Sequence, residues 1–162
     1  MLILSLDMKI IYMRPSYDIY FMSLALLASK RGSCARREVG CVLVNKSNRV
    51  ISTGYNGPLS GIQNCIDVPC PGASQPSGQS LDLCMAIHAE QNAMLTCDTK
   101  DIYTAYCTAL PCIQCSKMLA NTPCVRIAYL TEYPHGIGFW EKMGRQITKI
   151  QEEDVRAFLS SI

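Results

Sequence analysis

The segment IYTAYCTALPCIQCSKMLANTPCVRIAYL, residues 102–130, places two apolar runs on either side of a Pro-Cys-x-x-Cys turn and a helical pattern. The first run is rich in β-favouring residues and predicts a strand over 102–108. Pro111 is typical of a helix start and predicts a helix over 113–121, and the second run predicts a strand over 125–130. Alternating strands and helices predict an α/β fold, a layered sheet covered by helices.

The flanking segments extend this alternation in both directions. Apolar residues at spacings of three and four predict a helix over 16–31, which Gly32 ends. Two runs around Lys46-Ser47-Asn48 predict a hairpin of strands over 39–45 and 49–55. Further elements are expected as helices over 87–97, 138–143 and 152–160 and a strand over 146–150. The 162 residues predict a single domain over 14–162 after an N-terminal extension, residues 1–13.

Residues 57–84 interrupt the regular pattern. They contain four of the eight prolines and four of the ten glycines of the chain, so a long loop is predicted. A loop of this length inside a compact domain is unusual and tends to be functional or cross-linked. Cys65, Cys70 and Cys84 lie in it. We refer to residues 57–84 as the Cys-rich loop.

The composition limits the classes of partner. The 15 Lys and Arg residues and 13 Asp and Glu residues leave a formal charge of +2, which favours a small substrate over a nucleic acid. No stretch has the pattern of a secretory leader or the length of a membrane span. A cytoplasmic, reducing location is therefore expected, where closely spaced cysteines more often bind metal than form disulfides.

His88-Ala89-Glu90 and Pro111-Cys112-Ile113-Gln114-Cys115 carry the chemistry of a hydrolytic zinc site. His88, Cys112 and Cys115 supply three ligands and leave one position open, and zinc lowers the pKa of water in such a position toward ~7. Glu90 is expected to shuttle protons and not to bind the metal. Side chains two apart on a helix point about 200° apart, so His88 and Glu90 can converge only at an irregular helix start.

Each half of this motif has a simpler interpretation when it stands alone. An isolated Cys-x-x-Cys is more often half of a structural zinc site or a redox pair, and an isolated histidine at a helix start is usually a core or capping residue. His-x-Glu followed by Pro-Cys-x-x-Cys, with each half opening a helix, is the signature of the zinc deaminases. The joint pattern therefore predicts a deaminase.

Four segments carry a resemblance to the deoxycytidylate (dCMP) deaminases of phages and bacteria. They are Gly32-Ser33-Cys34-Ala35-Arg36-Arg37-Glu38-Val39-Gly40, Gly54-Tyr55-Asn56-Gly57, His88-Ala89-Glu90-Gln91-Asn92-Ala93 and Pro111–Cys115. The resemblance covers about residues 14–150, and its last motif is Glu132-Tyr133 after the fourth predicted strand. The resemblance implies a three-layer α-β-α fold with a five-stranded mixed sheet, and usually a homohexamer. It implies zinc-dependent hydrolysis of dCMP to dUMP. Asn56 is expected to bind the deoxyribose, the Ala89 N–H the pyrimidine carbonyl, and Tyr133 the base or phosphate.

Arg36 and Arg37 precede the first predicted strand, where a guanidinium could hold a monophosphate. A solvated basic turn is the competing interpretation. For Asn56 the alternative is a turn residue, and for Tyr133 it is core packing. Cys41, Cys97, Cys107 and Cys124 lie in apolar runs and are expected to be small core residues.

The resemblance also implies a structural zinc that involves Cys34. Cys65, Cys70 and Cys84 could complete a four-thiolate set, or another side chain could replace one of them. Related enzymes are commonly activated by dCTP and inhibited by dTTP near Gly54, Tyr55, Asn56 and Gly57. Here the stretch from His88 to Pro111 is shorter than usual, so effector contacts are expected to be altered or lost. Deamination of dCTP is a second candidate activity, with Mg²⁺ accompanying a triphosphate.

Three other functions share parts of this pattern. A polynucleotide deaminase acting on tRNA or single-stranded DNA uses the same zinc chemistry, but it predicts a basic groove with exposed aromatic residues. A non-catalytic zinc-stabilised interaction module leaves Glu90 without a role. A free-nucleoside deaminase generally lacks the Cys-rich loop and the Cys34 segment.

Overall fold

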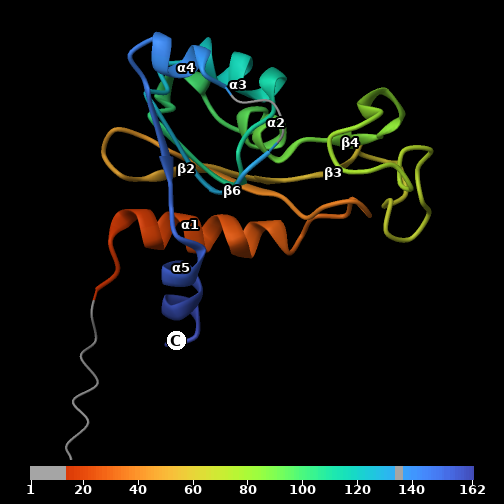
Figure 1. Cartoon of the computed structure of the whole chain (residues 1–162), viewed down its shortest axis with the longest axis horizontal. Coiled ribbons are helices and arrows are strands. Elements are labelled where there is room, and N and C mark those ends of the chain that lie inside the picture. The colour runs from red at the N-terminus through yellow and green to blue at the C-terminus, as the bar shows by residue number, and fades with distance from the viewer. Residues whose placement is uncertain (1–13, 134–136) are drawn as a thin grey trace, which may run out of the picture.

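The computed structural model describes residues 14–133 and 137–162 and consists of one sheet between two layers of helices (Figure 1). The predicted three-layer α/β architecture is confirmed. The predicted N-terminal extension, residues 1–13, lies outside the described residues.

The central sheet has five strands in the order β2-β1-β5-β6-β7. Their bounds are Gly40–Val44 for β1, Val50–Tyr55 for β2, Thr104–Ala109 for β5, Arg126–Thr131 for β6 and Gln146–Lys149 for β7. β1 pairs antiparallel with β2 and β5, while the β5–β6 and β6–β7 pairs are parallel. The sheet is therefore mixed, as predicted.

Helices cover both faces of this sheet. Their bounds are Tyr17–Ser29 for α1, Ala89–Met94 for α2, Ile113–Ala120 for α3, Phe139–Lys142 for α4 and Glu152–Leu159 for α5. α1 and α5 lie on one face, and α2, α3 and α4 lie on the other (Figure 1). Over residues 14–133 and 137–162, no helix combines the length and apolar character that a membrane span requires.

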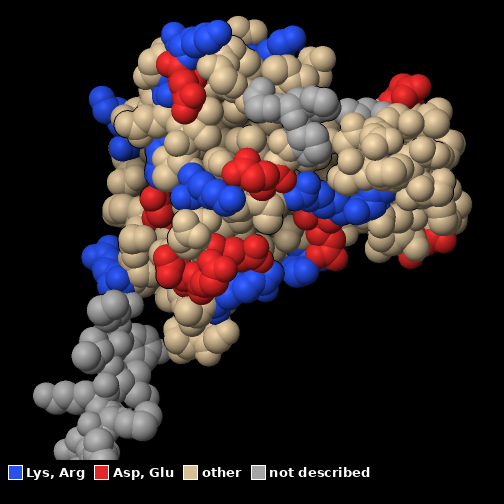
Figure 2. All heavy atoms as spheres, viewed as in Figure 1, with Lys and Arg blue, Asp and Glu red and all other residues tan. Residues whose placement is uncertain are grey.

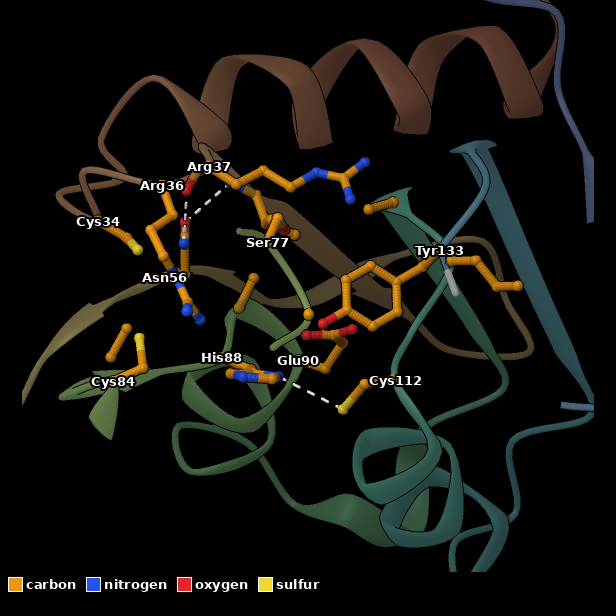
Figure 3. Close-up of a pocket in the computed structure, with 16 residues that line it drawn as sticks. Cys34, Arg36, Arg37, Asn56, Ser77, Cys84, His88, Glu90, Cys112 and Tyr133 are labelled. Atoms are coloured by element: carbon orange, nitrogen blue, oxygen red, sulfur yellow. Dashed lines mark hydrogen bonds between the residues drawn. The ribbon is translucent and has the colours of Figure 1, made fainter. Parts of the chain in front are cut away.

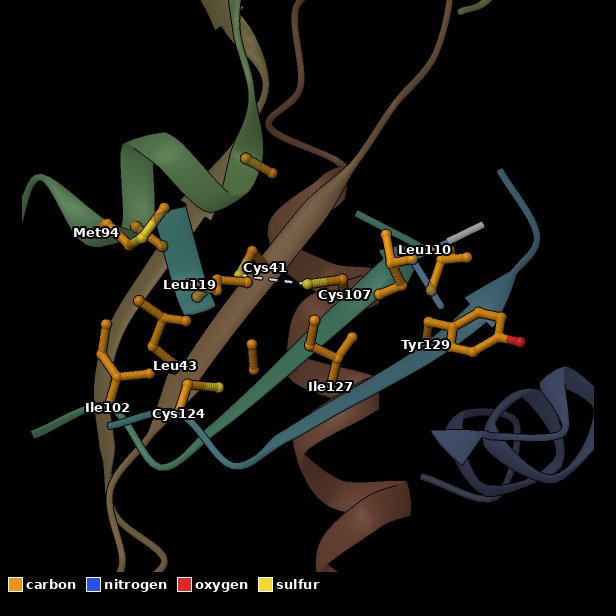
Figure 4. Packing of buried hydrophobic residues seen from close by; sticks show 14 of the residues in the cluster. Cys41, Leu43, Met94, Ile102, Cys107, Leu110, Leu119, Cys124, Ile127 and Tyr129 are labelled. Carbon is orange, nitrogen blue, oxygen red and sulfur yellow. Dashed lines mark hydrogen bonds between the residues drawn. The ribbon is translucent and has the colours of Figure 1, made fainter. Parts of the chain in front are cut away.

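Alternation along β1 divides the core between the two faces. Cys41 and Leu43 belong to the cluster beneath α2 and α3, whereas Val42 and Val44 belong to the cluster beneath α1. Figure 4 shows the first cluster, in which the Cys41 and Cys107 sulfurs of paired strands lie 3.7 Å apart. Cys41, Cys107 and Cys124 are buried core residues as expected, while Cys97 is only partly buried.

A polar network joins α1 to the sheet on its other face. The Asp18 carboxylate accepts two hydrogen bonds from the Arg126 guanidinium, at 2.7 and 2.8 Å, and one from the Tyr106 hydroxyl at 2.8 Å. Hydrogen bonding to Arg126 lowers the pKa of Asp18. This ion pair fixes the position of α1 over β5 and β6.

The Cys-rich loop contains two short elements that its composition did not predict. β3 (Gly57–Pro58) pairs antiparallel with β4 (Ala86–Ile87) and closes the base of the loop, and a 3-10 turn, η1, spans Leu81–Leu83. The predicted helix over 87–97 is also shorter than expected, because α2 ends at Met94 and a second 3-10 turn, η2, over Thr99–Asp101 is capped by the Asp98 side chain. The Thr96 hydroxyl donates to the Ala93 carbonyl at 3.1 Å, and this local side-chain bond accompanies the end of α2 three residues before the predicted one.

Gly54 permits the close approach of α2 to β2. A Cβ atom at this position would lie 2.1 Å from the Ala89 carbonyl oxygen and 2.5 Å from the Ala93 nitrogen. Both neighbours are backbone atoms, which cannot move aside without displacing the helix. Because α2 carries Ala89 and Glu90, this glycine controls the position of the candidate site.

We expect Gly54→Ala to destabilise the protein by about 1–3 kcal/mol or more, as overpacked cores do. The measurement is urea denaturation at a fixed zinc concentration. Gly138→Ala is the matched control, because nothing lies within 4 Å of a Cβ atom there, and it should change stability by less than about 0.5 kcal/mol. An equal, small effect of both substitutions would show that the α2–β2 approach is not tight.

Candidate active site

His88 lies at the boundary between β4 and α2, where the chain changes from extended to helical. Its backbone is extended, with φ −73° and ψ 155°, and α2 begins at Ala89. Its N–H donates to the Gln91 side chain at 2.9 Å, which completes this helix start. The side chains of His88 and Glu90 can therefore face the same space, because only Glu90 has helical backbone geometry. The predicted irregular helix start is confirmed.

Cys112 and Cys115 reach the same space from the start of α3. Cys112 is the residue before the helix and Cys115 lies in its first turn. Their sulfurs are 3.4 and 3.5 Å from the His88 Nδ1 atom, and the three ligand atoms lie within 4.8 Å of one another. A tetrahedral zinc with ordinary bond lengths would separate a nitrogen and a sulfur ligand by about 3.6 Å. The spacing therefore fits a zinc ion held by these three atoms.

The electrostatics of the three side chains support a thiolate-rich site. Hydrogen bonding from Cys115 lowers the pKa of Cys112 to about 4, and the same bond raises the pKa of Cys115. The hydrogen bond with Cys112 raises the pKa of His88. One thiolate is thus already stabilised by its neighbours, and a divalent cation would favour ionisation of the second.

The Glu90 carboxyl group lies beside this set and is buried. Its side chain is 3% exposed, and burial raises its pKa. A carboxyl group with a raised pKa can both accept and release a proton near neutral pH. The three-residue ligand group does not include Glu90, which leaves its carboxyl group available for proton transfer.

His88, Glu90 and Cys112 form the floor of a cavity that Figure 3 shows. The predicted substrate residues Arg36, Arg37, Asn56, Ala89 and Tyr133 all line it. The Tyr133 ring points into the cavity with its hydroxyl toward Glu90 (Figure 3). Sequence positions far apart therefore meet at one cavity.

Asn56 is buried and holds two segments together. Its Oδ1 atom accepts a hydrogen bond from the Val39 N–H at 2.8 Å, and its Nδ2 atom donates to the Arg37 carbonyl at 2.7 Å. An amide nitrogen carries two protons, so one donor of Asn56 remains for a ligand. Asn56 therefore stabilises the local turn and can also donate a hydrogen bond to the deoxyribose, as predicted.

Arg36 and Arg37 differ in their partners. Arg37 donates to the Thr131 hydroxyl and lies over the Tyr133 ring, 5.8 Å from its centroid. Arg36 instead donates to the backbone carbonyls of Gln79 and Gly72, at 2.8 and 3.4 Å. Among the residues that the structure describes, neither guanidinium is paired with a carboxylate.

The four cysteines of the predicted structural zinc site lie near one another without forming a compact ligand set. The Cys65 and Cys70 sulfurs are 3.5 Å apart. Burial raises the pKa of Cys84, and the neighbouring Cys34 and Cys70 thiols add to the rise. Within residues 14–133 and 137–162, no three of these sulfurs lie mutually within the 4.8 Å that His88, Cys112 and Cys115 satisfy. The four-thiolate set stays a prediction.

The predicted effector turn lies partly outside the cavity. Of its four residues, Asn56 lines the cavity and Gly54, Tyr55 and Gly57 do not. Gly54 packs against α2, and the Tyr55 carbonyl accepts a hydrogen bond from the Asn92 side chain at 2.8 Å. The Gly54–Gly57 turn is therefore held by its packing and hydrogen bonding against α2. Its role in effector binding stays a prediction.

Sequence reasoning missed Ser77 and Gly78, which line the cavity from the Cys-rich loop. It also missed Thr131, the hydrogen-bond partner of Arg37. Nothing in the loop sequence indicates its path, because it has no periodicity and its turns depend on distant contacts. Thr131 had a detectable signal, since it directly follows the strand predicted over 125–130 and lies two residues before Tyr133.

Comparison with known proteins shows the family to which the chain belongs. The profile of the "Cytidine and deoxycytidylate deaminase zinc-binding region" family matches residues 15–131. A deoxycytidylate deaminase of Mycobacterium phage D29 is 40% identical over 127 residues, which are 74% of this chain and 98% of the phage protein. The deoxycytidylate deaminase of Schizosaccharomyces pombe is 43% identical over 125 residues, 74% of this chain. This chain covers only 38% of the length of the yeast relative.

A solved structure shares the fold of this chain. The crystal structure of dCMP deaminase from cyanophage S-TIM5 in complex with dCMP and dUMP superposes with a TM-score of 0.68 at 29% identity. The match covers 86% of this chain and 100% of the phage chain. On this evidence the chain belongs to the cytidine and deoxycytidylate deaminase family and, within it, to the deoxycytidylate deaminases.

Proposed function

We propose that the protein hydrolyses the exocyclic amino group of dCMP and produces dUMP and ammonia. One observation carries this proposal: the buried Glu90 carboxyl group lies beside the His88, Cys112 and Cys115 ligand set, and it lines a cavity together with His88 and Cys112. A structural metal site needs no such acid, whereas hydrolytic deamination needs one. The names of the phage and yeast relatives, and the dCMP and dUMP in the phage crystal structure, support this substrate.

The zinc ligands, Glu90 and the Ala89 N–H each have a separate role in the proposed reaction. Zinc held by His88, Cys112 and Cys115 would supply the Lewis acidity that makes water acidic enough to lose a proton at neutral pH. Glu90 takes this proton and transfers it to the ring nitrogen next to the reacting carbon. It then takes the remaining proton of the added hydroxyl group and transfers it to the amino group, which leaves as ammonia. The Ala89 N–H, at the first position of α2 where no intrahelical acceptor exists, binds the pyrimidine carbonyl and orients the ring.

The sugar and phosphate would lie on the opposite side of the cavity. Asn56 offers its remaining amide donor to the deoxyribose, and the Tyr133 ring flanks the nucleotide. Arg37 suits a phosphate, because its partner Thr131 is a neutral hydroxyl that an anion can displace. A triphosphate would extend past Arg37, so dCTP accompanied by Mg²⁺ is a second candidate substrate.

A second, structural zinc held by Cys34, Cys65, Cys70 and Cys84 is part of this proposal. The 3.5 Å separation of the Cys65 and Cys70 sulfurs and the proximity of Cys34 to Cys84 support it.

We expect elemental analysis to give two zinc ions per chain, falling to one in a Cys65→Ser, Cys70→Ser double variant. One zinc per chain in the unaltered protein would reject the second site.

The remaining expectations concern assembly, regulation and location. The family resemblance supports a homohexamer that responds to dCTP and dTTP through Gly54, Tyr55, Asn56 and Gly57. The short α2, which ends at Met94, supports altered effector contacts. The cytoplasmic location stays a prediction.

A polynucleotide substrate is less well supported by the surface. Acidic and basic side chains are mixed on the face that Figure 2 shows, without a continuous basic groove. The formal charge of +2 provides little general attraction to a polyanion. The oligonucleotide reaction therefore serves as the competing outcome of the substrate test.

The proposal is tested by following loss of the amino group from dCMP, dCTP, CMP, deoxycytidine and short oligonucleotides. We expect the highest kcat/KM with dCMP. Glu90→Gln should lower kcat by at least about 100-fold, because it removes the proton carrier and keeps the side-chain shape. Glu153→Gln is the control, since Glu153 is exposed on α5, and it should leave kcat unchanged.

Zinc content should be equal in all three proteins, so that a lower rate reflects proton transfer. Turnover retained by Glu90→Gln would refute the shuttle role. Activity confined to oligonucleotides would refute the substrate.

A further inference from the structure

Arg36 joins two parts of the molecule that are remote in sequence. It lies between α1 and β1, and its Nη1 group donates to the Gln79 carbonyl at 2.8 Å and the Gly72 carbonyl at 3.4 Å. Both acceptors belong to the Cys-rich loop. A planar guanidinium is suited to bridging two carbonyl groups in this way.

The segment that Arg36 binds forms a wall of the active-site cavity. Ser77 and Gly78 lie between the two bonded residues, Gly72 and Gln79, and both line the cavity with His88 and Glu90. Figure 3 shows Ser77 between the arginines and Tyr133. The position of this wall therefore depends on what holds residues 72–79 in place.

Few other contacts of the described residues hold this segment. The backbone hydrogen bonds of residues 70–83 are local turns, such as Ala73 to Cys70 at 2.9 Å and Gln79 to Pro76 at 3.1 Å. Ile66 donates to the Ser33 carbonyl at 3.2 Å, which anchors the early part of the loop. The β3–β4 ladder closes its base. Between these two points, Cys70 has a hydrogen bond with the Met85 backbone, and Arg36 supplies the described hydrogen bonds that join residues 72–79 to the segment before β1.

Arg37 contacts the central sheet and not the Cys-rich loop. Its guanidinium bonds the Thr131 side chain of the sheet and makes none of the described hydrogen bonds to the Cys-rich loop. Adjacent arginines thus face the same cavity with different partners. Arg37 can exchange the neutral Thr131 hydroxyl for an anion. Arg36 would have to release the Cys-rich loop before it could bind an anion.

We propose that Arg36 is a positioning residue that holds residues 72–79 of the Cys-rich loop over the active site, so that Ser77 and Gly78 close the cavity around the nucleoside. This inference rests on the proposed deaminase function for its effect on catalysis, but not for the loop contact itself. Loss of Arg36 should weaken nucleotide and nucleoside alike, because the wall encloses the part that they share.

The test compares Arg36→Ala, Arg36→Gln, Arg37→Ala and the unaltered protein, with Arg49→Ala in the remote hairpin turn as a control. Hydrogen–deuterium exchange reports on the loop amides, and kcat and KM are measured for dCMP and deoxycytidine. Arg36→Gln removes the charge but keeps an amide donor for one carbonyl. All variants are compared at equal zinc content and after a thermal melt that confirms folding.

We expect Arg36→Ala to speed exchange over residues 72–80 by about tenfold or more, as loss of a charge-assisted hydrogen bond implies. It should raise KM for dCMP and deoxycytidine by the same factor with little change in kcat. Arg36→Gln should retain part of the protection. Arg37→Ala should raise KM for dCMP selectively and leave exchange in the loop unchanged, and Arg49→Ala should change neither measurement.

Three results would overturn the inference. The first is unchanged exchange in Arg36→Ala, and the second is faster exchange with both KM values unaltered. The third is a loss confined to dCMP, which would make Arg36 a phosphate ligand. If the unaltered protein deaminated no cytosine compound, the proposed function would fail, while the exchange measurement would still decide whether Arg36 holds the loop.

Discussion

The candidate active site depends on the convergence of two helix starts. His88 and Cys112 both occupy the last extended position before a helix, and each is held by a different part of the sheet. Because the first residues of a helix point their N–H groups and side chains toward its N-terminal end, the two starts direct donors and sulfurs into one space. The 3.4 Å between Cys112 Sγ and His88 Nδ1 is the result. A change that shifts either helix would separate the ligands.

The packing of the sheet maintains this convergence. Gly54 lets α2 approach β2 closely, and β5 leads directly into Pro111 and α3. On the opposite face, the Asp18–Arg126 pair joins α1 to the sheet. The catalytic floor is therefore part of the rigid core, whereas the wall formed by Ser77 and Gly78 belongs to a loop with few connections. This division allows the chemistry and the enclosure of the substrate to vary separately.

The sequence predicts the parts of this structure that local pattern controls. The five strands of the central sheet, the main helices and the candidate metal ligands follow from periodicity and from ligand spacing, which are properties of neighbouring residues. The path of the Cys-rich loop could not be predicted, because Arg36 reaches Gln79 across the fold and no local signal records such a bond. The early end of α2 was missed because the Thr96 hydroxyl competes for the Ala93 carbonyl, a bond that the pattern of apolar residues does not record. The different partners of Arg36 and Arg37 likewise depend on contacts distant in sequence.

The most direct test of the account is anomalous diffraction at the zinc edge from crystals of the Glu90→Gln protein soaked with dCMP. The account expects a peak bonded to His88 Nδ1 and the sulfurs of Cys112 and Cys115, with the reacting carbon of dCMP beside it and the residue 90 side chain facing the ring nitrogen. A fourth protein ligand on the metal at His88, Cys112 and Cys115, or a nucleotide bound away from that metal, would contradict it.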